Sequence, residues 1–199
     1  VDIEIFKRQL NTKTKLKIGS EIFDELSFDF SRDYFRQTEY ERADLIGAEF
    51  TIINYRGQLE LSNKNFLFID NGTSGLSIEY RDFKVGGFVF TAPTKSVKTS
   101  LFSYQSVSLG RTNIESAFRI SYDRLNPRKE NPSWKDEFMV DRNFLTYSLS
   151  FSLHQKLNDN FSAGGTFSRS SRVPTIEELY SEGPHLAAYS YEIGNPHLE

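Results

Sequence analysis

The sequence predicts an all-β fold, an antiparallel up-and-down meander of about eight strands. Apolar and polar residues alternate with a period of two along most of its 199 residues, which places them on opposite faces of extended strands. Turn-forming residues or longer polar stretches separate these segments. Aromatic residues reach 15% although apolar residues total only 38%. A water-soluble domain would need a large core to bury them, whereas a membrane barrel can turn them outward.

The first third of the chain shows the alternation from its start, with Val1, Ile3 and Ile5 facing away from Asp2 and Glu4. The predicted elements here are a strand at 1–10, a polar turn at 11–14, a strand at 15–35, a charged loop at 36–44 and a strand at 46–69. The phase of the second strand breaks near residues 22–23, which is typical of a β-bulge.

The remaining chain continues the meander, and its alternation is cleanest at residues 112–124 and 144–157. The predicted elements are a turn at 70–74, strands at 76–83, 99–109, 112–124, 144–157 and 160–168, and connections at 84–97, 110–112, 126–143 and 158–159. The even-numbered apolar residues of 114–122 and the odd-numbered ones of 145–157 are expected to face lipid.

The predicted connections alternate in length. Those near 11–14, 70–74, 110–112 and 157–160 are short, and those near 36–45, 84–97, 126–143 and 171–196 are long. Outer-membrane barrels have short periplasmic turns and long extracellular loops. The rhythm therefore favours a segment of a large transmembrane β-barrel over a soluble β-sandwich binding module, which is kept as an alternative.

The segment after the last strand carries an ordered set of short motifs: Arg-x-Pro-Thr, Glu-Leu-Tyr, Gly-Pro-His and Tyr-Glu-x-Gly-Asn-Pro. The residues concerned are Arg172, Pro174, Thr175, Glu178, Leu179, Tyr180, Gly183, Pro184, His185, Tyr191, Glu192, Gly194, Asn195 and Pro196. In this order the motifs resemble the late barrel region of TonB-dependent outer-membrane receptors. Residues 4–126 also resemble the zinc-receptor branch of that family.

The resemblance implies a barrel of about 22 strands around a plugged lumen. Residues 1–199 are then expected to form a partial β-barrel domain, with the N-terminal plug and the remaining strands outside this sequence. It further implies the outer membrane of a Gram-negative-type bacterium, and uptake of a scarce nutrient such as a metal, haem or siderophore chelate. The implied partners are that ligand, outer-membrane lipid and the TonB complex, which the family contacts through its N-terminal region.

Composition and motifs exclude several other classes of function. The net charge is −3 with no basic run, so nothing indicates a nucleic-acid partner, and without cysteine neither a disulfide nor a thiolate metal site is possible. The sequence lacks metalloprotease, hydrolase, phosphate-loop and dinucleotide signatures. We therefore expect neither an enzyme nor a cofactor; the enzyme alternative is a lipase-like barrel that brings a serine to His154 at the outer rim.

Candidate site residues lie mainly in the motif segment. Glu182 and His185 are spaced to hold a borderline metal ion, although a loop-shaping role for His185 is favoured. For Arg172 and Glu178 an ion pair that braces the loop base is favoured over substrate contact. Tyr180, Tyr189 and Tyr191 are expected either to form an aromatic receptor surface or to anchor the membrane interface, and the second role is favoured. Pro174, Gly183 and Asn195 complete the motif set, and His154 is expected to line the lumen.

Overall fold

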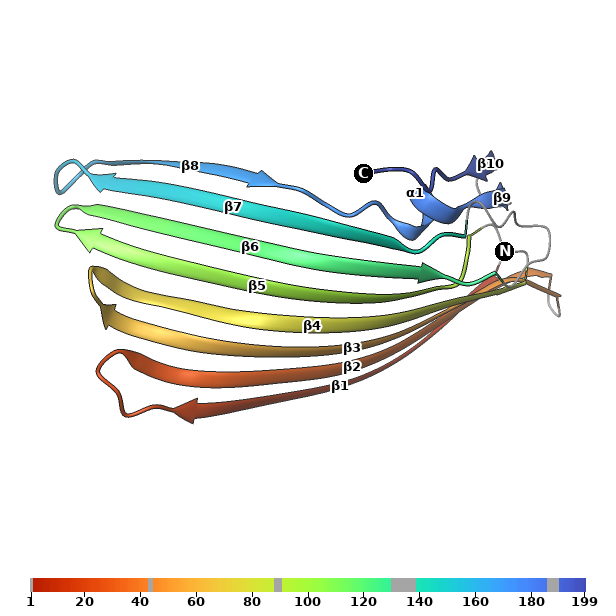
Figure 1. Cartoon of the computed structure of the whole chain (residues 1–199), viewed down its shortest axis with the longest axis horizontal. Coiled ribbons are helices and arrows are strands. Elements are labelled where there is room, and N and C mark those ends of the chain that lie inside the picture. Colours follow the sequence, from red (N-terminus) through yellow and green to blue (C-terminus); the bar gives the residue numbers. More distant parts are fainter. Residues whose placement is uncertain (1, 43–44, 88–90, 130–138, 186–189) are drawn as a thin grey trace.

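The computed structural model describes residues 2–42, 45–87, 91–129, 139–185 and 190–199, and these form an eight-stranded antiparallel sheet (Figure 1). The strands are β1 (Asp2–Lys17), β2 (Phe23–Arg42), β3 (Leu45–Phe66), β4 (Ile69–Gly87), β5 (Thr94–Leu109), β6 (Thr112–Pro127), β7 (Arg142–Lys156) and β8 (Ser162–Ser170). Each strand pairs with the next one in the sequence. The predicted all-β meander is confirmed.

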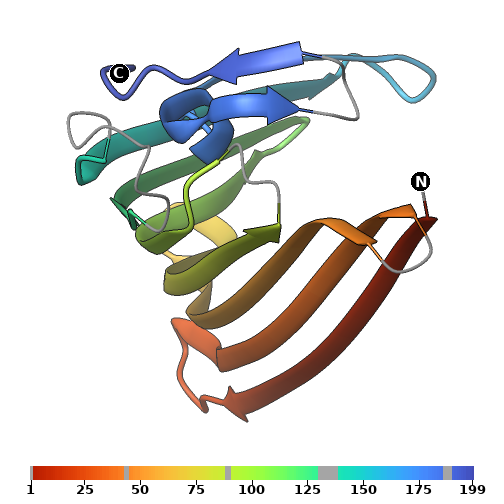
Figure 2. The ribbon, with the colours of Figure 1, turned by 90° about the vertical axis from the view of Figure 1, so that its right-hand side faces the viewer.

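The sheet is curved, and its strands are arranged along an open arc whose two edges are β1 and β8 (Figure 2). Seven of the eight strands are long, from the 15 residues of β7 to the 22 residues of β3. One end of the sheet carries the hairpin turns at 18–22, 67–68, 110–111 and 157–161, and we call it the turn end. The opposite end, which we call the loop end, carries the C-terminal segment (Figure 1).

The predicted turn at 11–14 is wrong, because β1 passes straight through it. Its polar residues lie on a strand face where they meet polar partners; Lys13 pairs with Asp29 at 3.3 Å. The true turn follows β1, and Ser20 Oγ accepts a hydrogen bond from the Ile22 backbone N–H at 3.2 Å. The bulge predicted near residues 22–23 matches a register shift between Phe23 and Glu25 in the pairing of β2 with β3, at the start of β2.

Two further boundary predictions are wrong, because here too polar residues that were expected to form a loop or turn continue a strand. The charged stretch at 36–44 is largely strand, since β2 runs to Arg42 and its polar groups pair across the hairpin; Thr38 Oγ1 donates to Glu49 Oε2 at 3.2 Å. The predicted turn at 70–74 belongs to β4, and the chain instead reverses at Leu67, which has a φ of 57°. Within β4, position 72 requires glycine, because a Cβ on Gly72 would lie 2.7 Å from the carbonyl oxygen of Tyr104.

The later hairpins match the predictions. Gly110 adopts a φ of 62° at the β5–β6 turn, a conformation that glycine reaches without strain. At the β7–β8 turn Asn158 Oδ1 accepts hydrogen bonds from the backbone N–H groups of Asn160 and Phe161, both at 2.9 Å. Residues 88–90 and 130–138, which include Trp134, fall in predicted long connections and lie outside the described residues.

The long loop predicted at 171–196 is wrong in part, because it contains regular structure. It holds α1 (Ile176–Tyr180), β9 (Glu182–His185) and β10 (Ser190–Ile193), and β9 and β10 pair as a small antiparallel sheet. We call residues 172–185 and 190–199 the C-terminal unit; it lies at the loop end (Figures 1 and 2). No helix in the described part of the chain is long and apolar enough to cross a membrane.

Candidate functional site

One face of the sheet is apolar and exposed. The strand register aligns six large side chains across six neighbouring strands, β2 to β7, and their exposed fractions range from 37% to 53%. We call them the apolar row: Phe28, Leu59, Leu76, Leu101, Ile120 and Tyr147. The alternating residues of β6 and β7 that were expected to share a face do share it, since Ile120 pairs with Tyr147 and Phe118 with Leu149. We call this side the apolar face.

The opposite side, the polar face, is lined by small hydroxyl residues and charge pairs. Ser100 and Ser121 are nearly inaccessible, at 3% exposure each, and their hydroxyl groups lie 2.9 Å apart. Arg56 donates from Nε and Nη2 to Glu79 Oε2, at 3.0 Å and 2.8 Å. Lys98 lies 3.5 Å from Asp123. One face of the sheet therefore carries polar groups that pair with one another, and the other carries exposed apolar side chains.

His154 lies on the polar face as expected, in register with Asn113 and Gly164. It stands close to the turn end of β7, because β7 ends at Lys156. The loop end, where the C-terminal unit lies, is at the other end of the same strand. A lipase-like site that joins His154 to a rim serine at the loop end is therefore not assembled by these strands.

The helix of the C-terminal unit is fixed by a capping box that the sequence analysis missed. Thr175 Oγ1 accepts the Glu178 backbone N–H at 3.2 Å, and Glu178 Oε2 accepts the Thr175 N–H at 2.8 Å. A threonine followed three residues later by a glutamate is the signal that could have predicted this helix start. The reciprocal bonds satisfy backbone donors that a helix N-terminus otherwise leaves open.

Arg172 and Glu178 form the bracing ion pair that the sequence analysis favoured. The guanidinium donates from Nη1 to Oε2 at 2.7 Å and from Nη2 to Oε1 at 2.8 Å, a two-pronged geometry that lysine could not reproduce. The Arg172 hydrogen bonds, followed by the backbone N–H of Thr175, lower the pKa of Glu178 from 4.5 to about 2. Both side chains are exposed, so the pair orders the entry to α1 more than it stabilises the fold.

Tyr180 lies inside the molecule, so its assignment to an aromatic surface or to the membrane interface is wrong. It is 1% exposed and Leu179 is 0% exposed, and the two pack with Ala92, Leu125 and Phe144 at the loop end. Its hydroxyl donates to the Val140 carbonyl oxygen at 3.0 Å. Burial raises the pKa of Tyr180 to about 12. Tyr191, by contrast, is 64% exposed, and Tyr189 lies outside the described residues.

The Gly-Asn-Pro motif closes the C-terminal unit. Gly194 N–H donates to the Ser181 carbonyl at 2.7 Å, and Asn195 N–H donates to the Glu178 carbonyl at 2.7 Å. A Cβ at Gly194 would lie 2.7 Å from the carbonyl carbon of Leu179, so only glycine fits. Pro196 is fully buried. The motif thus binds the end of β10 to the end of α1.

The remaining motif positions have mainly structural surroundings. Pro174 and Gly183 are buried, and Gly183 pairs with Glu192 across the β9–β10 sheet. Glu182 and His185 stand at opposite ends of β9, and the side chain of His185 lies outside the described residues. Within the described part of the chain, no three His, Asp or Glu side chains are grouped to hold a metal ion.

Comparisons with known proteins leave the family open. No family model matches the sequence, and no curated protein matches it. The resemblance of residues 172–196 to TonB-dependent receptors stays a prediction that rests on the motif residues themselves.

Proposed function

We propose that this chain forms part of the wall of a transmembrane β-barrel that takes up a scarce nutrient across a bacterial outer membrane. The observation that carries the proposal is the exposed apolar row, set against a polar face whose groups pair with one another. Soluble proteins rarely leave a continuous apolar patch of this extent in contact with water. In a bilayer the same row would lie against acyl chains.

The free energy involved favours a lipid environment. Burying one large apolar side chain completely contributes about 1.5–3 kcal/mol. The six residues of the apolar row are about half exposed. Covering them would therefore add on the order of 5–10 kcal/mol. A β-sandwich would supply that cover with a second sheet, and the described strands form no second layer over this face.

The two edge strands of the sheet support the same proposal. Every backbone group at membrane depth needs a partner within the protein, and an antiparallel meander provides partners for all strands except the two at its edges. In a wider barrel β1 and β8 would pair with further strands of the wall. The polar face, with its serine pairs and ion pairs, would then line the lumen through which a metal, haem or siderophore chelate passes, driven by the TonB complex.

Uptake is tested by growth under limitation. The gene that encodes this chain is disrupted in its source bacterium, and growth is measured in media depleted separately of iron, zinc and haem, with and without the intact gene supplied in trans. We expect a growth defect in one depleted medium that disappears when the nutrient is added in excess. Equal growth of disrupted and intact strains in all three media would contradict the uptake proposal.

A further inference from the structure

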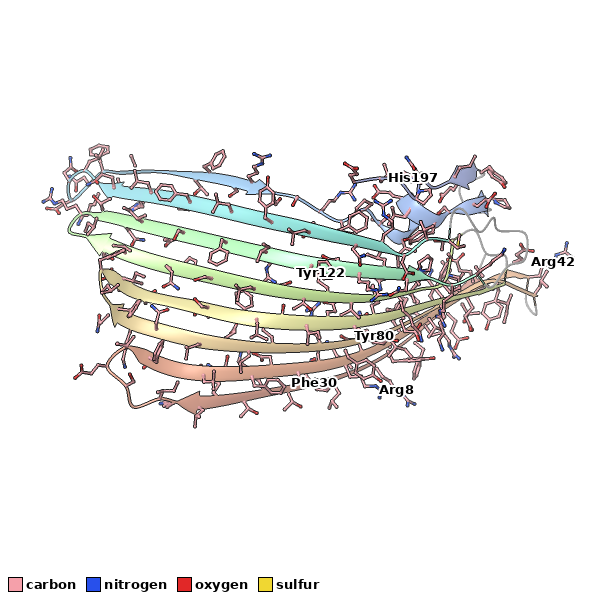
Figure 3. All side chains as sticks on the ribbon, in the orientation of Figure 1. Arg8, Phe30, Arg42, Tyr80, Tyr122 and His197 are labelled. Carbon is pink, nitrogen blue, oxygen red and sulfur yellow. The ribbon has the colours of Figure 1, made fainter. Side chains whose placement is uncertain are left out.

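Three arginines gather on the apolar face around the middle of β1 and β2. Arg8 of β1 pairs across the hairpin with Tyr34 of β2, which makes Arg32 and Arg36 its two diagonal neighbours on the same face. Diagonal cross-strand neighbours lie about 7–8 Å apart, within reach of long side chains. Figure 3 shows Arg8 nearer to the loop end than Phe30, where the apolar part of this face begins. We call Arg8, Arg32 and Arg36 the arginine triad.

The triad is held by aromatic rings. Arg8 Cζ lies 4.9 Å from the centre of the Phe6 ring, and Arg36 Cζ lies 5.9 Å from the same ring. Arg32 Nε donates to the Tyr55 hydroxyl at 3.3 Å. These contacts orient the guanidinium groups while leaving their charge uncompensated.

Within the described part of the chain, no carboxylate lies at ion-pair distance from the triad. Glu4 and Glu49, the acidic residues on this face nearest the triad in register, accept hydrogen bonds from the Tyr40 hydroxyl and Thr38 Oγ1, both at 3.2 Å. Several basic residues elsewhere do have carboxylate partners, such as Arg56 with Glu79. Like charges that lie close together across a hairpin destabilise it. An anion bound between the three arginines would turn their repulsion into a stabilising interaction.

A groove of about 590 Å³ lies at this place, and its lining includes Phe6, Leu10, Tyr34 and the arginine triad. From Leu10 the same face continues toward the turn end through Phe30 and Phe28. The surface therefore changes along the strand direction from cationic to apolar. A membrane lipid complements this surface along its length, with an anionic headgroup to meet the cationic part and acyl chains to meet the apolar part.

We propose that the arginine triad binds the phosphate-bearing headgroup of a membrane lipid whose acyl chains lie along Phe30 and Phe28. The inference rests on the proposed function, because it needs the apolar face to lie against lipid. Guanidinium groups bind phosphate oxygens in two-pronged hydrogen bonds, so arginine suits this ligand better than lysine. The long arginine side chains also reach the interface from a backbone position beside the acyl chains.

The experiment uses the full chain in zwitterionic detergent micelles, titrated with dioleoyl phosphatidic acid, with dioleoylglycerol, with inorganic phosphate and with a phosphoserine peptide. Binding is followed by calorimetry and by native mass spectrometry. The test variant carries Arg8→Gln, Arg32→Gln and Arg36→Gln. A matched control carries Lys13→Gln, Lys15→Gln and Arg56→Gln, which removes three positive charges from the polar face of β1 and β3.

We expect phosphatidic acid to bind the unaltered chain, the triad variant to bind it at least about tenfold more weakly, and the control to bind it within about twofold. Equal binding of dioleoylglycerol, or an equal loss in the control, would overturn the proposal. Equally tight binding of inorganic phosphate or of the phosphopeptide would make the triad a site for soluble anions. If the chain inserts into micelles without preference for phosphatidic acid, only this inference fails; if it does not insert, the proposed function fails with it.

Discussion

The eight-stranded sheet and the C-terminal unit place the same kinds of side chain in opposite surroundings. In the sheet, Leu101 and Tyr147 are 53% and 48% exposed, whereas in the C-terminal unit Leu179 and Tyr180 are 0% and 1% exposed. The unit is organised as a small water-soluble domain would be, with apolar side chains inside and caps and ion pairs outside. The sheet reverses that order. This contrast is what the proposal requires, in which the apolar face of the sheet meets lipid and the C-terminal unit meets water.

The largest effect is expected from a mutation on the apolar face of the sheet. A charge placed in the apolar row by Leu76→Arg should destabilise the chain in phosphatidylcholine vesicles by about 2–4 kcal/mol, because lipid cannot solvate it. Urea unfolding followed by circular dichroism measures the change. Ser77→Arg is the matched control, since Ser77 neighbours Leu76 on β4 but faces the polar side. Equal losses in the two variants would mean that the faces do not differ in solvent.

A smaller effect is expected inside the C-terminal unit. Gly194→Ala places a methyl group 2.7 Å from the Leu179 carbonyl carbon and should destabilise the unit by about 1–3 kcal/mol through overpacking. Hydrogen exchange of α1 and β10 amides reports the loss. The control is Gly165→Ala in β8, where a Cβ meets nothing within 4 Å. Unchanged protection in Gly194→Ala would contradict the close packing described here.

Tyr180→Phe removes one buried hydrogen bond and should cost about 1 kcal/mol of stability in the C-terminal unit. The Tyr180 hydroxyl should also make the stability of the C-terminal unit depend on pH. Its folded pKa of about 12 lies above the ordinary 10.0, because burial disfavours the phenolate. The stabilisation that the neutral Tyr180 hydroxyl provides is therefore complete below pH 10 and is lost as the pH rises toward 12. Proteolysis across this range should separate the unaltered chain from Tyr180→Phe, and identical profiles would contradict the assignment.

The smallest effect concerns the exposed ion pair. The folded pKa of Glu178 lies below its ordinary value, so its contribution is present above pH 4.5 and is lost as the pH falls toward about 2. Glu178→Gln should remove this acid dependence and loosen the start of α1, with little change in the sheet. Carboxylate chemical shifts followed by NMR titration measure the pKa directly. An ordinary pKa for Glu178 would mean that the Arg172 contact does not persist in solution.

The sequence predicted the strands and their faces well, because period-two alternation is a local signal. It misplaced the turns near residues 11–14, 36–44 and 70–74, where polar residues continue a strand and only the partner strand shows that they pair. It missed α1, whose one clear signal was the capping box at Thr175 and Glu178. It also missed the arginine triad, since only the β1–β2 register brings Arg8 between Arg32 and Arg36.

The central claim is that the apolar face lies against acyl chains while the polar face lies against water. Because the chain has no cysteine, single nitroxide labels can be placed at Leu149→Cys on the apolar face and at Ser148→Cys on the polar face of β7. Accessibility to oxygen and to a water-soluble nickel complex is then measured by electron paramagnetic resonance in phosphatidylcholine vesicles. The label at 149 should collide mainly with oxygen and the label at 148 mainly with nickel. Equal collision with nickel at both positions would contradict the account.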